Sequence, residues 1–178
     1  PMDKIIIGAL ISGFFGPLFV YFVRKKLLTR RKKPDMIREA LQTSSKVVAK
    51  IEHMREEFQA DRIWITQFHN GGHFYPTGKS MAKFSIIYET VDVGVSSVQS
   101  NFQNIPVNLF SKSINHLLDN GTIEISDFKD ETIATHGLKY VADSAGCKSE
   151  YLFAIRAIDD RFIGVLGVDY VKKKTKLS

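Results

Sequence analysis

The chain begins with an unbroken apolar stretch. The residues from Ile5 to Val23 carry no charge. As a helix that rises about 1.5 Å per residue they would cover about 28 Å, close to the ~30 Å thickness of bilayer hydrocarbon. A signal peptide is the competing interpretation, but the run is longer than usual and no small-residue cleavage site follows it. The pattern predicts one transmembrane helix, within residues 1–33.

A second pattern, with helical spacing, follows the break at Pro34-Asp35. Its apolar positions fall on one face of a helix: Ile37, Ala40, Leu41, Val47, Val48, Ile51, Met54 and Phe58. The spacing resembles a heptad, although Ser44 and Arg55 occupy seam positions. We predict a linking amphipathic helix within 34–61 that packs on its own domain, on a second copy of the chain, or on both.

Residues 62–171 show a mixture of strand and helix patterns. Strands are expected at 62–68, 83–91, 122–126, 150–158 and 162–171, and helices at 107–118 and 130–145. A long loop at 69–82 separates the first two strands, the polar stretch 92–104 is either helix or loop, and Asp159-Asp160-Arg161 joins a terminal hairpin. This order predicts an α/β (α+β) domain, followed by a basic tail at 172–178.

The positive charge is confined to the two ends. Residues 1–33 carry eight Lys/Arg against one acid, 34–171 carry thirteen against eighteen, and 172–178 add four lysines, for a net charge of +6. The predicted domain is therefore acidic, which disfavours a nucleic-acid partner. One cysteine, Cys147, excludes an internal disulfide framework.

The basic cluster beside the span predicts its orientation. It comprises Arg24, Lys25, Lys26, Arg30, Arg31, Lys32 and Lys33. The positive-inside rule places the C-terminal domain in the cytoplasm, on a bacterial inner membrane, and the cluster would contact anionic lipid headgroups. Within the span, Gly8, Ser12 and Gly16 form a stripe of small residues that allows close helix packing, so we expect a homo-oligomer.

The 69–82 segment is the candidate ligand site. Its glycines would let backbone amides approach an anion, and its side chains supply donors. The residues predicted to bind a small anionic or nucleotide-like ligand are His69, Asn70, Gly71, Gly72, His73, Tyr75 and Lys79. The alternative is a wide hairpin connection in which Asn70-Gly71 adopts positive φ.

Catalysis and metal binding are not expected. His69 and His73 would need a third ligand, such as His53, His116, His136 or Cys147, and their spacing aligns them only on a helix. Cys147 and Ser144 lack a nucleophile signature, and Asp159-Asp160 fits a turn. We predict no catalytic residues, no metal and no cofactor.

The last two strands carry a family resemblance. The sequences YLFAIRAI at 151–158 and RFIGVLGVD at 161–169 resemble the end of a GAF domain, which closes with an "iGvL" strand. The resemblance covers about 36–171. It implies a central antiparallel sheet with helices on both sides and a small-molecule pocket or dimer interface, and it carries no common catalytic set.

A narrower resemblance lies at 67–74, QFHNGGHF, which is similar to the "FHNG" turn of uncharacterised membrane-anchored GAF-like proteins of phages and bacteria. The function predicted is a single-pass, membrane-anchored, non-enzymatic sensing or interaction protein. The alternative is a pore-forming or lysis-regulating protein similar to the T-type holins of T-even phages, whose globular domain is periplasmic. A soluble enzyme with a leader cleaved near residue 23 is a third class.

Overall fold

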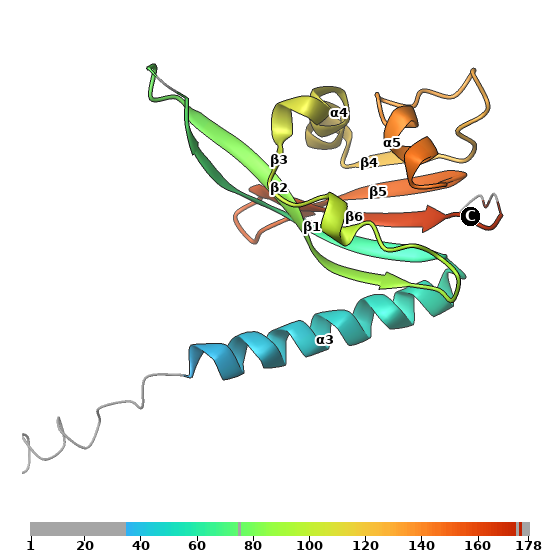
Figure 1. Ribbon diagram of the computed structural model, residues 1–178, viewed down its shortest axis with the longest axis horizontal. Coiled ribbons are helices and arrows are strands. Elements are labelled where there is room, and N and C mark those ends of the chain that lie inside the picture. The colour runs from blue at the N-terminus through green and yellow to red at the C-terminus, as the bar shows by residue number, and fades with distance from the viewer. Residues whose placement is uncertain (1–34, 75, 174, 176–178) are drawn as a thin grey trace, which may run out of the picture. The chain divides into compact units, whose positions relative to one another are not determined.

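The computed structural model describes residues 35–74, 76–173 and 175 (Figure 1). The predicted span, its stripe Gly8, Ser12 and Gly16, the basic cluster at 24–33, and Tyr75 lie outside the described residues. Among those described, no helix has the length and hydrophobicity needed to cross a membrane. The chain divides into two compact units, 1–43 and 44–178, and the fold given below is that of the second.

Helix α3 spans Met36–Glu57 and confirms the amphipathic helix expected there. The Asp35 carboxylate accepts a hydrogen bond from the Arg38 amide at 3.2 Å, which caps the first turn. From Ser44 onward the helix belongs to the second unit, where Ile51 is buried and Met54 packs against the same core.

Six antiparallel strands form one sheet in the order β3-β2-β1-β6-β5-β4 (Figure 1). The strands are β1 Arg62–His73, β2 Ser80–Val91, β3 Ile105–Pro106, β4 Thr122–Ile125, β5 Ser149–Arg156 and β6 Phe162–Tyr170. The first and last long strands pair in the middle of the sheet, with Arg62 opposite Asp169 and Thr66 opposite Val165. The expected α+β architecture with a central antiparallel sheet is confirmed.

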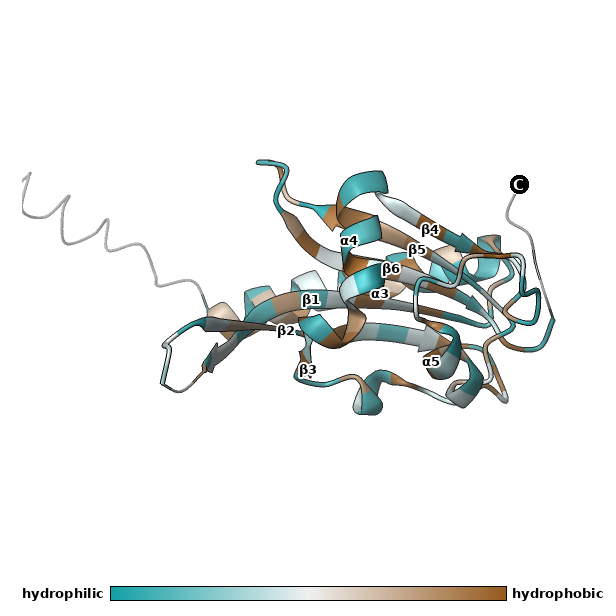
Figure 2. Ribbon diagram, turned by 90° about the horizontal axis from the view of Figure 1, so that it is seen from above, coloured by the Kyte–Doolittle hydropathy of each residue, from teal (hydrophilic) through white to brown (hydrophobic). Residues whose placement is uncertain are grey.

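The two faces of the sheet are sorted by strand alternation, visible as apolar bands in Figure 2. On β6, Val168 and Tyr170 face the core that α3 covers, whereas Val165 faces the opposite core. The second face is covered by α4 (Ser111–Asn120), α5 (Lys139–Ser144) and the 3-10 helices η2 (Gln99–Asn101) and η3 (Val107–Phe110). Helices therefore flank both sides of the sheet.

The expected long loop at 69–82 is wrong, because both strands of a hairpin run through it. The ladder continues past His69, which pairs with Lys83, to His73, which pairs with Ser80. Within this hairpin extension, called the 69–82 ribbon below, Gly71 is closely approached by the facing strand: a Cβ on Gly71 would lie 2.6 Å from the Lys83 side chain. Positive φ occurs at Gly72 and not at Asn70-Gly71. Close strand pairing thus overrides the turn signal of the glycines.

The helix expected at 130–145 is also wrong over its first half, since α5 covers only Lys139–Ser144. Upstream, the Asp127 and Asp130 carboxylates accept hydrogen bonds from the backbone two residues later, and His136 has a φ of 50°. These Asx-type contacts compete with helix formation. The stretch 92–104 is mostly loop, with η2 near its end.

Helix α4 ends as its sequence indicates, at Gly121 with a φ of 79°. The terminal hairpin is confirmed as well, with Asp160 at a φ of 63° between β5 and β6. These residues tolerate the left-handed conformation that each turn requires.

Asp61, between α3 and β1, forms hydrogen bonds with three other segments of the domain. Its carboxylate accepts hydrogen bonds from the Val171 and Lys172 amides at 2.6 and 2.8 Å, directly after β6. Its own amide donates to the Asp169 carbonyl at 3.0 Å, and its carbonyl accepts from the Asp92 amide at 2.8 Å. The end of α3 and the end of the last strand therefore meet at one residue.

Candidate functional site

A partly open cavity of about 70 Å³ lies between the sheet and the layer of α4 and α5. One water molecule occupies roughly 10–15 Å³ by this kind of measure, so the cavity has room for several waters or a compact ligand. The helices and the residue after α5 contribute small or aliphatic side chains to it, including Ser113, Leu117, Ala142 and Ala145. The sheet contributes its aromatic and charged side chains.

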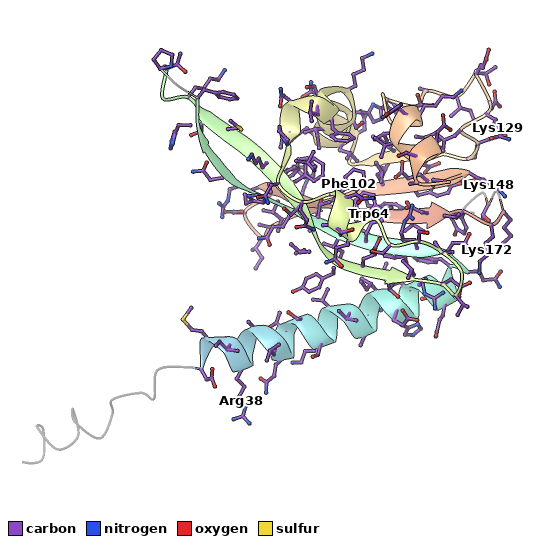
Figure 3. The ribbon with its side chains drawn as sticks, in the orientation of Figure 1. Arg38, Trp64, Phe102, Lys129, Lys148 and Lys172 are labelled. Atoms are coloured by element: carbon purple, nitrogen blue, oxygen red, sulfur yellow. The ribbon has the colours of Figure 1, made fainter. Side chains whose placement is uncertain are left out.

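Aromatic rings form much of the wall. Five of them come from β1, β2 and the segments that carry η2 and η3: Trp64, Phe68, Phe84, Phe102 and Phe110. Phe84 meets Phe110 edge to face at 5.5 Å between ring centroids. Trp64 and Phe102, both labelled in Figure 3, reach the cavity from the sheet and from the loop that precedes β3. The wall is therefore largely apolar and π-rich.

A row of charged residues crosses three adjacent strands at one side of the cavity. Arg62 on β1 lies opposite Asp169 on β6, which in turn lies opposite Glu150 on β5. The Arg62 guanidinium donates to Asp169 Oδ2 from Nε at 2.7 Å and forms an ion pair from Nη2 at 2.7 Å. Its third nitrogen donates to the Ser96 carbonyl at 2.9 Å. The Trp64 indole Nε1 also donates to Asp169, at 3.1 Å.

Arg62 and Asp169 are each only 1% exposed, so their pair is sealed from bulk water. Burial raises the pKa of Asp169, and the Arg62 and Trp64 contacts oppose that shift. Because the guanidinium is bound directly to Asp169, we assign the ionised state to Asp169. Neighbouring carboxyls that share one cation rarely both ionise, which directs the proton of the pair to Glu150.

Glu150 lies deep in the domain, yet part of its surface is accessible because it borders the cavity. Burial raises the pKa of Glu150 well above its ordinary value, with a further contribution from Asp169 and an opposing one from Arg62. Within the described part of the chain its carboxyl group has no hydrogen bond and no ion pair. It is the one polar group of the charged row that is left without a partner in that part.

Cys147 also lines the cavity and is buried. Burial raises the pKa of its thiol, and its Sγ donates to the Ser149 carbonyl at 3.1 Å. Ser144 is exposed and donates to the Val141 carbonyl at 2.8 Å. The thiol is therefore held in its neutral, weakly nucleophilic form.

The loop residues predicted to bind a ligand lie elsewhere. His69, Asn70, Gly71, Gly72 and His73 follow one another on the outer part of β1, beyond Gln67, where its pairing with β6 ends. His69 Nε2 lies 3.0 Å from Ser85 Oγ, and the Asn70 side chain accepts from the Gly72 amide at 2.9 Å.

Lys79 stands beside the turn of this ribbon and accepts a backbone hydrogen bond from Phe74 at 2.9 Å. None of the described residues of the predicted set lines the cavity, and ligand binding by the ribbon stays a prediction. Over 35–74, 76–173 and 175, no three His, Cys, Asp or Glu side chains are grouped to hold a metal ion.

Three residues of the charged row carry a signal in the sequence. Glu150 and Asp169 are acids at the inward positions of otherwise apolar strands, and Arg62 opens the first strand. A charge at an inward strand position is costly unless it is paired or functional. Acidic residues at inward positions of apolar strands are therefore the sequence signal for this site.

The fold and its cavity place this domain in the class of GAF-like folds. Its structure is similar to the phycocyanobilin-bound GAF domain of a cyanobacterial phytochrome, with a TM-score of 0.59, 18% identity, and coverage of 80% of this chain and 78% of that one. It is also similar to the blue-light absorbing form of the PixJ GAF domain of Thermosynechococcus elongatus, with a TM-score of 0.57, 16% identity, and coverage of 83% and 78%.

A far-red cyanobacteriochrome photoreceptor is similar over 89% of this chain and 87% of its own, with a TM-score of 0.55 and 15% identity. No family model matches the chain, and no curated protein matches it. At these identities the likeness establishes the fold, and the GAF-like architecture expected from the terminal hairpin is confirmed.

Proposed function

We propose that this chain is a single-pass, membrane-anchored sensor whose GAF-like domain binds a small molecule in the cavity between the sheet and helices α4 and α5. The observation that carries the proposal is the combination of an aromatic wall with an unpartnered carboxyl group, Glu150, at the same cavity. Buried polar groups are normally paired, and an exception within a pocket indicates a ligand that completes it.

The fold neighbours support a small-molecule role. Structures similar to this one hold phycocyanobilin, phycoerythrobilin and biliverdin IXα. The cavity of about 70 Å³ suits a more compact molecule. In this proposal the domain is a binding module and not an enzyme, and burial makes its cavity thiol, Cys147, a poor nucleophile.

Identification of bound material tests ligand binding. The full chain, purified in detergent, is analysed by native mass spectrometry and by extraction under denaturing conditions. We expect a small molecule that is lost in Ala145→Leu, which adds bulk at the cavity wall, and retained in Ser144→Leu, which adds the same bulk at the exposed neighbouring position. Material that survives equally in both variants would contradict a cavity ligand.

Membrane anchoring, a cytoplasmic domain and homo-oligomerisation through the span and α3 are further parts of the proposal. They are supported by the apolar run at 5–23 and by the basic cluster that follows it. A protein with this arrangement would report the ligand state of its domain at the inner membrane.

Thiol labelling in intact cells tests the orientation. Lys129→Cys places a reporter on an exposed part of the domain, and Asp3→Cys places one on the other side of the predicted span. An impermeant reagent should label only the second reporter, and light scattering in detergent should give a small oligomer. The holin-like alternative requires the reverse labelling and large assemblies.

A further inference from the structure

The placement of Glu150 breaks a local rule of sheet construction. Glu150 on β5 stands directly opposite Asp169 on β6, and like charges at opposed positions destabilise a sheet. The Arg62 guanidinium binds Asp169 and the Ser96 carbonyl and forms no hydrogen bond or ion pair with Glu150, so Glu150 avoids the repulsion by holding a proton. Such a departure from local consistency is typical of a functional position.

The cavity wall carries one basic side chain and two acidic ones. Its ionisable residues are Arg62, Asp169, Glu150 and the neutral thiol of Cys147, and the sides formed by α4 and α5 contribute none. Arg62 and Asp169 neutralise each other, so the wall is neutral while Glu150 holds a proton and carries one net negative charge once Glu150 is ionised. An anionic ligand would be repelled by an ionised Glu150, whereas a cationic ligand would supply the counter-charge that this carboxylate lacks.

The remaining wall favours a cation as well. Trp64, Phe68 and Phe102 line the same space, and aromatic rings attract organic cations most strongly where water is excluded. An apolar body on the ligand would fill the aromatic part of the cavity while its charged end reaches the charged row.

We propose that the cavity recognises a compact organic cation, an amine with an apolar or aromatic body, and that Glu150 is its counter-ion. This inference rests on the proposed function of the cavity as a ligand site. It differs from the anionic ligand predicted for the 69–82 ribbon both in the place of binding and in the charge of the ligand.

Binding of the cation has a proton balance. At a pH below its raised pKa, the Glu150 carboxyl group of the empty cavity holds a proton, and it must lose that proton to form an ion pair with an ammonium group. Each ammonium bound as a cation therefore releases one proton to the solvent, and the affinity should rise with pH until Glu150 is ionised in the free protein.

Three probes of the same size test the inference: benzylammonium, benzyl alcohol and benzoate. Trp64 is the only tryptophan of the chain and lines the cavity, so its emission reports binding to the full chain in detergent. We expect benzylammonium to bind at least about tenfold more tightly than benzoate, the ratio that corresponds to about 1.4 kcal/mol.

The variants assign this preference to one residue. Glu150→Gln keeps the shape of the side chain and should abolish the preference, whereas Glu124→Gln, at an exposed position of the neighbouring strand β4, should retain it. Equal or tighter binding of benzoate, or a preference that survives in Glu150→Gln, would overturn the proposal.

The ligand-identification experiment distinguishes failure of the organic-cation proposal from failure of the proposed ligand-binding function. A cavity-dependent ligand that is neutral or anionic would refute the organic cation and leave the sensor function intact. If no probe changes Trp64 emission and no small molecule copurifies, both proposals fail. A copurified amine that is lost in Glu150→Gln would support both.

Discussion

The indole ring of Trp64 packs directly over Gly167 on the neighbouring strand, where an added Cβ would lie 2.2 Å from two ring carbons. The absence of a side chain at Gly167 gives the ring its place on the sheet. From that place the indole nitrogen donates to Asp169, and the ring forms part of the cavity wall. Gly167 is thus required by a close approach and not by its backbone conformation, since its φ is not positive.

Gly167→Ala should displace the Trp64 ring. We expect a loss of about 1–3 kcal/mol in the free energy of unfolding, the usual cost of overpacking, together with a changed Trp64 emission spectrum. Denaturant unfolding of the full chain in detergent measures the first effect. In a Trp64→Leu background the same glycine substitution should cost much less, and an equal cost in both backgrounds would contradict this packing.

The buried ion pair should be far more sensitive than an exposed one. Asp169→Asn leaves the Arg62 guanidinium without its counter-charge, and breaking a buried pair in this way costs about 3–5 kcal/mol. Asp159→Asn, which removes the partner of Arg161 on the surface, is the matched control and should change stability little. Similar losses in the two variants would show that Arg62 gains other partners.

Glu150 should make the empty domain less stable as the pH rises. Its pKa is raised in the folded state above its ordinary value of 4.5, so its proton is bound more tightly in the folded than in the unfolded chain. The corresponding stabilisation is complete below that ordinary value and is lost as the pH rises through the raised pKa. Glu150→Gln removes this titration.

The difference in melting temperature between Glu150→Gln and the unmodified protein should therefore grow in favour of the variant with increasing pH. Thermal unfolding of both proteins, free of ligand, from about pH 4.5 to about pH 8 measures it. The other ionisable groups that line the cavity with residue 150 are Arg62, Asp169 and Cys147, and they are present in both proteins. A difference that is constant with pH would show that Glu150 is ionised throughout.

The sequence predicted the regular parts of this fold well because their patterns are local. Alternation in β5 and β6 marks the terminal hairpin, and helical spacing marks α3. The sequence does not predict the continuation of both strands through 69–82, because glycine by itself favours a loop, whereas Gly71 lies within β1 and is closely approached by the Lys83 side chain of the facing strand.

The pairing of the site residues depends on contacts between distant strands, which no local pattern contains. The role of Glu150 follows from its position opposite Asp169, and that of Asp169 from its bond to Arg62, at the far end of the domain sequence. Only the sheet order, with β6 between β1 and β5, brings the three side chains into one row. Glycine and histidine content therefore favours the 69–82 ribbon as a binding site, whereas the cavity is defined only by the sheet order.

Cys147 should be nearly inert in the folded protein. It is 6% exposed, and burial raises its pKa, so thiolate is scarce and inaccessible to reagents. We expect a maleimide to react with it on the order of 100-fold more slowly than with the exposed reporter in Lys129→Cys, and to react freely after unfolding. Comparable rates in the native state would mean that the cavity opens readily.

The hydrogen bonds of Asp61 connect the cavity wall with the end of α3. Asp169 in the cavity wall is two residues from Val171, whose amide is held by the Asp61 carboxylate, and the Asp61 amide is itself bonded to the Asp169 carbonyl. A ligand that displaces Asp169 would therefore also strain the two hydrogen bonds that hold this part of the chain to Asp61, next to the end of α3. The cavity wall and the C-terminal end of α3 are therefore connected through the hydrogen bonds of a single residue, Asp61.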